Sequence, residues 1–233
     1  MNPATVYDAL IDPIDTPLTI TRAVDVGQWV RVDTEESVGT AYSMSEATRP
    51  LLDARPLDGQ NLADAAARAR SWNLREASFG VAALAAWYSH PDNVAAHGFE
   101  PMPGTLNWGE VFQPFREEVA GRKVAVIGHF PFALPALGKA ADFAMIERHP
   151  KEGDYPDAAA EYLLPDCDWV FISGSAMVNK TMPRLLELAA DARTVLIGPS
   201  TPLAPVLFDH GVDVLTGLAL TGDGQMQRVW SGL

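Results

Sequence analysis

The segment KVAVIG, residues 123–128, decides the fold class of this chain. It is a continuous apolar run that ends at a glycine, and comparable runs recur at Asp142–Ile146, Asp168–Ile172, Thr194–Ile197 and Val212–Leu215. A helical or turn-forming segment follows each run. Uninterrupted apolar strands that alternate with helices are typical of a parallel sheet covered on both faces. The second half of the chain is therefore predicted to be a Rossmann-like α/β domain with a mostly parallel sheet.

The first half has a different pattern, in which strands precede helices. Short runs rich in Val, Thr, Tyr and Trp predict an antiparallel meander over Leu18–Val24, Gln28–Val32 and Ser37–Ser43. The Ala-rich segment Asn61–Ser71 is a predicted helix. A second helix is predicted to begin at Asn73, where the sequence NLRE has the form of a capping box. This order of elements predicts a smaller α+β domain.

The two patterns meet in the Pro/Gly-rich stretch FEPMPGTLNW, residues 99–108. Neither a helical nor a strand pattern can continue through it. We place a boundary near Pro103, which divides the chain into an α+β domain at residues 1–103 and a Rossmann-like domain at residues 104–233.

The composition is that of an ordinary globular protein. Its 233 residues are 48% hydrophobic and 20% charged, which argues against a disordered or fibrous chain. The formal net charge of -13 leaves no basic surface for nucleic acid or for an anionic membrane. No apolar run approaches the roughly 18 residues of a membrane helix, and the single cysteine, Cys167, cannot form an internal disulfide. These features indicate a cytoplasmic protein that binds neither nucleic acid nor membrane.

Ligands of parallel sheets bind beyond the carboxyl ends of the strands, so the loops after the predicted strands are candidate sites. The first of these loops contains Gly128, His129, Phe130 and Pro131. A dinucleotide fingerprint requires three glycines here, which argues against NAD. His129 could act as an acid or base, and Phe130 offers a ring for stacking.

The second predicted strand ends at Glu147, which follows Gly128 by roughly 20 residues. In dinucleotide-binding Rossmann domains, an acidic residue at about this distance from the glycine-rich loop contacts a ribose hydroxyl. A ligand contact by Glu147 and an ion pair with Arg148 or Lys151 are both open. Asp154, in the nearby turn, is a candidate by proximity alone.

The third loop is the most polar in the chain and contains Ser173, Gly174, Ser175 and Asn179. Thr181 follows as the predicted N-cap of a helix over Met182–Ala190. An anionic or carbonyl group could dock against this loop, although Ser173, Gly174 and Thr181 are also ordinary turn and cap residues.

The fourth loop contains Gly198, Pro199, Ser200 and Thr201, followed by Pro202. A glycine turn, a hydroxyl cap and a first-turn proline predict that a second helix begins here and faces the same crevice. The five histidines lack the spacing of a metal site, so no metal ligand is predicted among them, and the residues identify no cofactor.

Several of these segments resemble a known family. GHFPF at 128–132, GDYP at 153–156, the segment at 163–189 and GPSTPLAPVLFDHGVDVLTG at 198–217 resemble DUF364, whose members are described as heavy-metal chelation proteins. The first half resembles the companion domain DUF4213, an enolase N-terminal-like α+β module, through its strands and the segment SFGVAALAA at 78–86. The family pattern falls on Gly128, Phe130, Pro131, Glu147, Gly174, Ser175, Asn179, Thr181, Gly198, Pro199 and Pro202.

The resemblance implies one site where the loops of the Rossmann-like domain meet the N-terminal domain. Family members often carry an asparagine in the second N-terminal helix, where this chain has Ala85, so Asn93 or His97 is the alternative N-terminal contribution. The implied reaction is condensation or hydrolysis of a flavin-, pterin- or siderophore-like metabolite. In this hypothesis Glu147 is the acid/base or orients the ligand, and Asn179 holds a carbonyl or anion with the backbones of 173–175 and 200–201.

Two alternatives stay open at this point. One is a non-catalytic module that binds a metal chelate or a nucleotide-like ligand, and the other is an enzyme similar to S-adenosylmethionine-dependent methyltransferases. The expected partner in each case is a small-molecule metabolite or metal chelate, and a homodimer is one assembly that the chain could form.

Overall fold

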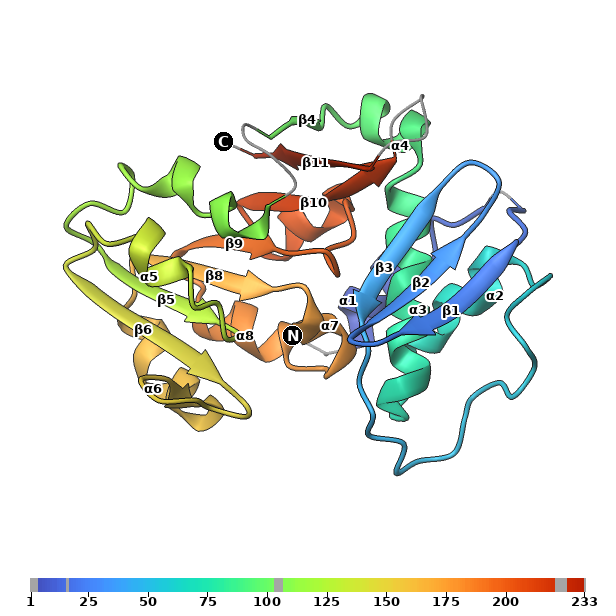
Figure 1. Ribbon diagram of the computed structural model, residues 1–233, viewed down its shortest axis with the longest axis horizontal. Coiled ribbons are helices and arrows are strands. Elements are labelled where there is room, and N and C mark those ends of the chain that lie inside the picture. Colours follow the sequence, from blue (N-terminus) through green and yellow to red (C-terminus); the bar gives the residue numbers. More distant parts are fainter. Residues whose placement is uncertain (1–3, 16, 103–106, 221–225, 233) are drawn as a thin grey trace.

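The computed structural model describes residues 4–15, 17–102, 107–220 and 226–232. Its described strands form two sheets, one of three strands and one of eight. Figure 1 shows the small sheet and its helices on the right, and the large sheet on the left with its parallel strands aimed at the small sheet. We call the residues through helix α4 (Pro91–Ala96) the N-terminal part and those from strand β4 (Glu100–Pro101) onward the C-terminal part.

The N-terminal part is an antiparallel meander packed on helices. Its sheet has the order β1-β2-β3, with the elements α1 (Ala4–Ile11), β1 (Arg22–Val26), β2 (Trp29–Asp33), β3 (Val38–Tyr42), α2 (Leu62–Ala67), a 3₁₀ turn (Arg68–Arg70), α3 (Leu74–Tyr88) and α4 (Pro91–Ala96). Val30 and Val32 alternate with exposed neighbours along β2, which buries one face of the sheet. The predicted order of strands followed by helices holds from β1 onward, whereas α1, which precedes the strands, was not predicted. The first strand begins at Arg22, and Thr19 makes only an isolated bridge to Asn61.

The predicted capping box at the start of α3 is half wrong. Asn73 is the N-cap, and its side chain accepts a hydrogen bond from the Glu76 N–H at 3.2 Å. Glu76 does not return the bond, because its buried carboxylate accepts the N–H groups of Leu52 at 2.8 Å and Asp53 at 2.9 Å, and the hydroxyl of Ser71. The long loop before α2 is thereby tied to the first turn of α3.

The C-terminal part contains a mixed, mostly parallel sheet. Its order is β4-β11-β10-β9-β8-β5-β6-β7, with β4 (Glu100–Pro101), β5 (Lys123–Ile127), β6 (Asp142–Glu147), β7 (Tyr155–Pro156), β8 (Trp169–Ser173), β9 (Arg193–Ile197), β10 (Val214–Leu220) and β11 (Met226–Ser231). The six strands that lie side by side in the order β7-β6-β5-β8-β9-β10 are parallel, as predicted. In contrast, β11 pairs antiparallel with both β10 and β4. These two antiparallel strands were not predicted.

The helices between the parallel strands are short. They are α5 (Ala133–Ala136), α6 (Ala160–Leu163), α7 (Ser175–Val178) and α8 (Met182–Leu188), with 3₁₀ turns at Asp157–Ala159, Leu164–Asp166 and Pro205–His210. Two further 3₁₀ turns, at Trp108–Glu110 and Gln113–Phe115, precede β5. The helix predicted to begin at Pro202 is wrong. Ala204, which precedes Pro205, is extended, and the chain coils only from Pro205 onward. A residue before proline is restricted to extended conformations, which accounts for the delay.

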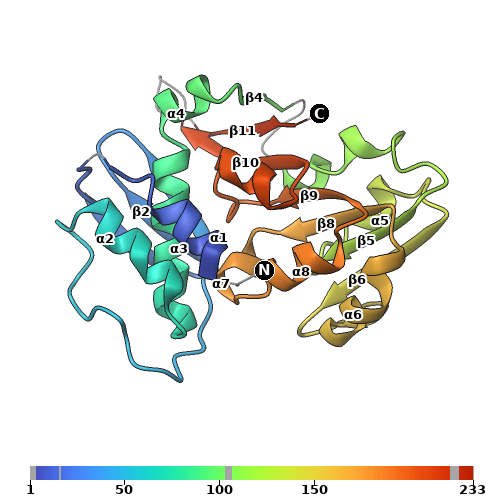
Figure 2. The ribbon, with the colours of Figure 1, turned by 180° about the vertical axis from the view of Figure 1, so that it is seen from behind.

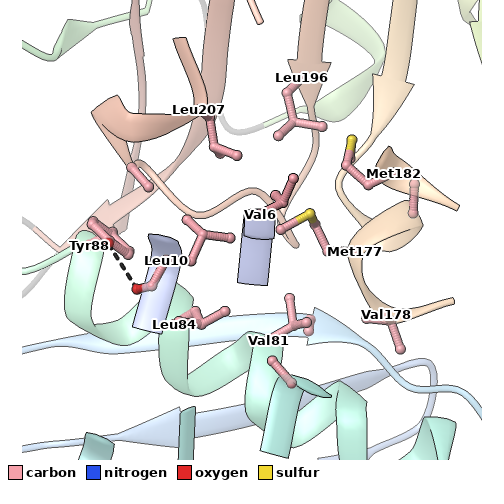
Figure 3. Packing of buried hydrophobic residues seen from close by; sticks show 14 of the residues in the cluster. Val6, Leu10, Val81, Leu84, Tyr88, Met177, Val178, Met182, Leu196 and Leu207 are labelled. Atoms are coloured by element: carbon pink, nitrogen blue, oxygen red, sulfur yellow. Dashed lines mark hydrogen bonds between the residues drawn. The ribbon is translucent and has the colours of Figure 1, made fainter. Parts of the chain in front are cut away.

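One hydrophobic core joins the two parts. In Figure 3, Val6 and Leu10 of α1 and Val81 of α3 pack against Met177 and Leu207 of the C-terminal part. Seen from behind, α1 lies between α3 and the large sheet (Figure 2). The predicted boundary at Pro103 lies outside the described residues, and β4, just before it, already pairs in the large sheet. The division at this residue stays a prediction.

Candidate functional site

The order of the parallel strands places a switch point between β5 and β8. From β5 the chain moves outward to β6 and then returns past β5 to β8, β9 and β10. In open α/β sheets, ligands bind at the carboxyl ends of the strands where the order reverses in this way. The two loops at this point touch, because a Cβ added to Gly128 after β5 would lie 3.2 Å from the Cβ of Ser173.

Glu147 holds backbone groups at this edge of the sheet. Its carboxylate accepts the N–H of His129 and the N–H of His149, each at 3.0 Å. Glu147 therefore braces the loop after β5 against its own strand end. No ion pair of Glu147 with Arg148 or Lys151 is found within the described ranges.

His129 is paired with Asp154, which sequence reasoning considered only for its position in a turn. His129 Nδ1 lies 2.8 Å from Asp154 Oδ2, which also accepts the Lys151 N–H at 2.9 Å. The Asp154 side chain is 3% exposed and that of His129 is 25% exposed. A buried carboxylate on Nδ1 orients the imidazole and leaves Nε2 as the nitrogen that faces away from the pair.

Phe130 and Pro131, which follow His129 in this loop, differ in their exposure. The Phe130 ring packs edge-to-face on Phe112 and Phe132, with centroids 5.5 and 5.7 Å away, and belongs to the aromatic cluster beneath the sheet. Pro131 is exposed. The structure thus places the Phe130 ring in packing contacts within the protein.

The loop after β8 is compact. The hydroxyls of Ser173 and Ser175 are 2.8 Å apart, and both residues are half-buried. A Cβ on Gly174 would lie 2.6 Å from the backbone of Ser200 and Thr201, so a glycine is needed where the loops after β8 and β9 cross.

The loop after β9 is clamped to the N-terminal part. Following Gly198, the Pro199 carbonyl accepts the Thr40 hydroxyl at 2.9 Å, and Ser200 Oγ accepts the Tyr42 N–H at 2.8 Å. Ser200 and Thr201 are almost fully buried. These residues join the two parts, and their side chains are closed to solvent.

Asn179 and Thr181 form one hydrogen-bonded turn. Asn179 Oδ1 accepts the Thr181 N–H at 3.1 Å and the Thr181 hydroxyl at 2.6 Å. Thr181 occupies the N-cap position of α8, as predicted, but it has helical φ and ψ and its side chain makes no capping bond. Asn179 Oδ1 is occupied, so Nδ2 is the amide group that remains available to a ligand.

Asn179 lines a hollow between the two parts of the molecule. This hollow has a volume of about 390 Å³ and is lined by Glu46, Thr48, Arg49, Trp72, Leu74 and Asn179. We call it the Asn179 hollow. Its size is within the roughly 300–1,000 Å³ of small-molecule sites. Of the three predicted catalytic residues only Asn179 lines it, and Glu147 and His129 do not.

The N-terminal wall of the hollow was missed by sequence reasoning. Ala85 is buried, and Asn93 and His97 belong to α4 and its C-terminal end, where Asn93 donates to the Trp87 carbonyl. One feature of the sequence could have indicated this wall: the segment between β3 and Asn61 is long and forms no helix or strand. Long loops of this kind are commonly functional.

Lys180 fastens the C-terminal wall to the N-terminal part. Its Nζ donates to the carbonyls of Ala69 and Val178 and lies 4.9 Å from the centre of the Tyr7 ring. Burial lowers the pKa of Lys180 to about 8. The Tyr7 hydroxyl donates to the Met177 carbonyl at 2.7 Å. This bond joins α1 directly to α7, next to the contact between Lys180 and the Tyr7 ring.

The described side chains offer no cluster of metal ligands. Within the described ranges, no three His, Cys, Asp or Glu side chains come together in a group that could hold one. The same residues contain no helix long and apolar enough to cross a membrane.

Comparison with known proteins assigns the chain to a family. DUF364, described as "Putative heavy-metal chelation", matches residues 110–231, and DUF4213, with the same description, matches residues 7–88. The chain therefore belongs to the DUF364 family, as the sequence predicted, with a DUF4213 region before it.

Solved structures of the family share this fold. A DUF364-family protein of unknown function from Desulfitobacterium hafniense DCB-2 is 35% identical, with 98% of both chains covered and a TM-score of 0.86. A second, from Pyrococcus horikoshii, is 19% identical over the whole of both chains, with a TM-score of 0.78, and is similar in fold. An uncharacterized protein of Methanocaldococcus jannaschii is 29% identical over 181 residues, which are 75% of this chain and 66% of that protein, just under two thirds of its length.

Proposed function

We propose that this protein binds and transforms a small metabolite in the Asn179 hollow, as part of the metabolism of a metal chelator. The observation that carries the proposal is the composition of the hollow, which takes its walls from both parts of the chain. The family description supplies the connection to heavy metals. The described acidic, histidine and cysteine side chains form no metal-binding group, so in this proposal the metabolite, not the protein, holds the metal.

The residues have distinct roles in this proposal. Asn179 donates from Nδ2 to a carbonyl or carboxylate of the metabolite, because Thr181 occupies its Oδ1. His129, oriented by Asp154, and Glu147, which holds the His129 backbone, lie outside the lining of the hollow. In this proposal His129 is the acid or base for condensation or hydrolysis of a metabolite that extends beyond the hollow to the loop after β5. The loop after β9 holds the carboxyl edge of the large sheet against β3 through the hydrogen bonds of Thr40 and Tyr42.

A non-catalytic binding module is the second candidate. It is favoured by the absence of both Glu147 and His129 from the lining of the hollow. It would bind the chelate through the same residues without turning it over.

The finer description of the fold is part of the proposal. We infer that the C-terminal part is Rossmann-like, with a boundary near Pro103, and that the N-terminal part is enolase N-terminal-like. The strand order around β5 supports the first assignment, and the meander followed by α2 and α3 supports the second. The single cysteine of the chain supports a cytoplasmic location.

Native mass spectrometry of freshly purified protein tests the function. Wild type is expected to retain a small molecule at one copy per chain, and Asn179→Ala is expected to lose it. Added Zn and Ni salts should change the mass of the retained species only when the organic ligand is present. Metal bound without any organic ligand would contradict the proposal. Conversion of the retained molecule on incubation separates an enzyme from a binding module.

A further inference from the structure

Two opposite charges without partners face the same hollow. Glu46 and Arg49 both line it and both are exposed, yet neither forms an ion pair with the other or with another described residue. Most other arginines in the described ranges are bound to carboxylates or carbonyls, for example Arg70 and Arg184. Arg22 is exposed and forms no ion pair with a described residue either, but it does not line the hollow, so Arg49 is the guanidinium available there.

The loop that carries these charges is held in place before any ligand arrives. The Leu74 N–H donates to the Glu46 carbonyl at 2.8 Å, and Asn73 Nδ2 donates to the Arg49 carbonyl at 2.9 Å. The Glu76 carboxylate accepts the N–H groups of Leu52 and Asp53, which follow Arg49 in the same loop. A backbone that is ordered in advance reduces the entropy lost on binding.

An apolar surface lies beside the charges. Trp72 is 67% exposed although its sequence neighbours Ser71 and Asn73 are buried, and Leu74 also lines the hollow. An exposed indole offers a flat face to an apolar or aromatic group.

We propose that the Asn179 hollow recognises the zwitterionic α-amino acid group of a ligand whose side chain is apolar or aromatic. The carboxylate pairs with Arg49 and receives the Nδ2 hydrogen of Asn179, the ammonium pairs with Glu46, and the side chain lies on Trp72. An amine and a carboxylate on one carbon are also a chelating unit, so this ligand class suits the family description. The inference rests on the proposed function, because it names the substrate class of the same site.

Calorimetry with three probes on the full chain tests the assignment. The probes are L-phenylalanine, 3-phenylpropionate and 2-phenylethylamine, which share a ring and carry both charges, the carboxylate alone and the ammonium alone. L-phenylalanine should bind most tightly. Arg49→Gln should weaken binding of both acids at least tenfold and leave the amine unchanged. Glu46→Gln should weaken the binding of L-phenylalanine and of 2-phenylethylamine and leave the binding of 3-phenylpropionate unchanged.

Two further variants separate ligand contacts from general effects. Trp72→Ala should weaken all three probes. Arg75→Gln is the matched control, because Arg75 is exposed on α3, faces Asp25 and does not line the hollow. Circular dichroism of each variant checks that it folds.

The outcomes distinguish this inference from the proposed function. Failure of all three probes to bind, or binding that neither Arg49→Gln nor Glu46→Gln alters, overturns the inference. If mass spectrometry finds a retained metabolite without an α-amino acid group, the inference fails and the proposed function stands. If neither a metabolite nor a probe binds, both fail.

Discussion

Asn73 joins the start of α3 to Arg49: its Nδ2 donates to the Arg49 carbonyl at 2.9 Å while its Oδ1 accepts the Glu76 N–H at 3.2 Å. One side chain thus caps a helix and holds a wall of the Asn179 hollow. Local secondary structure and the candidate site therefore depend on the same residue.

Two substitutions at Asn73 should separate these roles. Asn73→Ser keeps an N-cap acceptor but loses the donor to Arg49 without introducing a buried charge, so it should leave global stability nearly unchanged and speed amide hydrogen exchange in residues 46–53. Asn73→Ala removes both bonds and should also lower the free energy of unfolding by about 1 kcal/mol. Urea unfolding and hydrogen exchange measure the two effects. Equal exchange in wild type and Asn73→Ser would show that this bond does not hold the loop.

Glu76→Gln should be strongly destabilising. The buried carboxylate accepts three hydrogen bonds, and a glutamine would turn an NH₂ group toward one of these donors. We expect a loss of roughly 2–3 kcal/mol in the free energy of unfolding. Glu117→Gln is the control, because Glu117 is exposed and pairs with Lys139 at the surface. Similar stabilities of the two variants would contradict the assigned role of Glu76.

Gly174→Ala should disturb the crossing of the loops after β8 and β9. The new Cβ would lie 2.6 Å from backbone atoms of Ser200 and Thr201, which cannot move aside as a flexible side chain can. Overpacking of this kind costs about 1–3 kcal/mol, measured as a lower urea midpoint. Gly109→Ala is a milder comparison, since its Cβ would meet only the side chain of Asn107, at 3.2 Å. A Gly174→Ala protein as stable as Gly109→Ala would refute this close approach.

Lys180 should make stability depend on pH. Its pKa in the folded chain is about 8, below the ordinary 10.5, so between these values the unfolded chain keeps a proton that the folded chain has released. Stability should therefore rise from about pH 8 toward pH 10, and the full penalty of the buried charge is present below pH 8. The shift corresponds to roughly 3 kcal/mol at most.

Urea unfolding between about pH 7 and pH 10 measures this dependence. Lys180→Met should abolish the rise, whereas Lys139→Met, at an exposed ion pair, should retain it. Burial raises the pKa of both Tyr7 and Tyr88, which opposes the trend only above about pH 10. A wild-type profile that is flat from pH 8 to pH 10 would rule out this role of Lys180.

Sequence alone determined the features that depend on local pattern. The apolar runs at Lys123–Ile127 and Trp169–Ser173 are strands because a doubly covered sheet demands continuous burial, and this pattern is visible in the sequence. The cap at Asn73 was predictable because it spans only three residues. Asn179 was singled out because it follows a strand in a polar loop.

Tertiary structure decided which side chains meet. The partner of His129 is Asp154, 25 residues away, and the wall opposite Asn179 comes from Glu46, Arg49 and Trp72 in the other part of the chain. No local periodicity encodes such contacts, because they depend on how α1, α3 and α7 pack in a shared core. The site arises from that packing, whereas the elements that carry it follow from hydrophobic pattern and backbone preference.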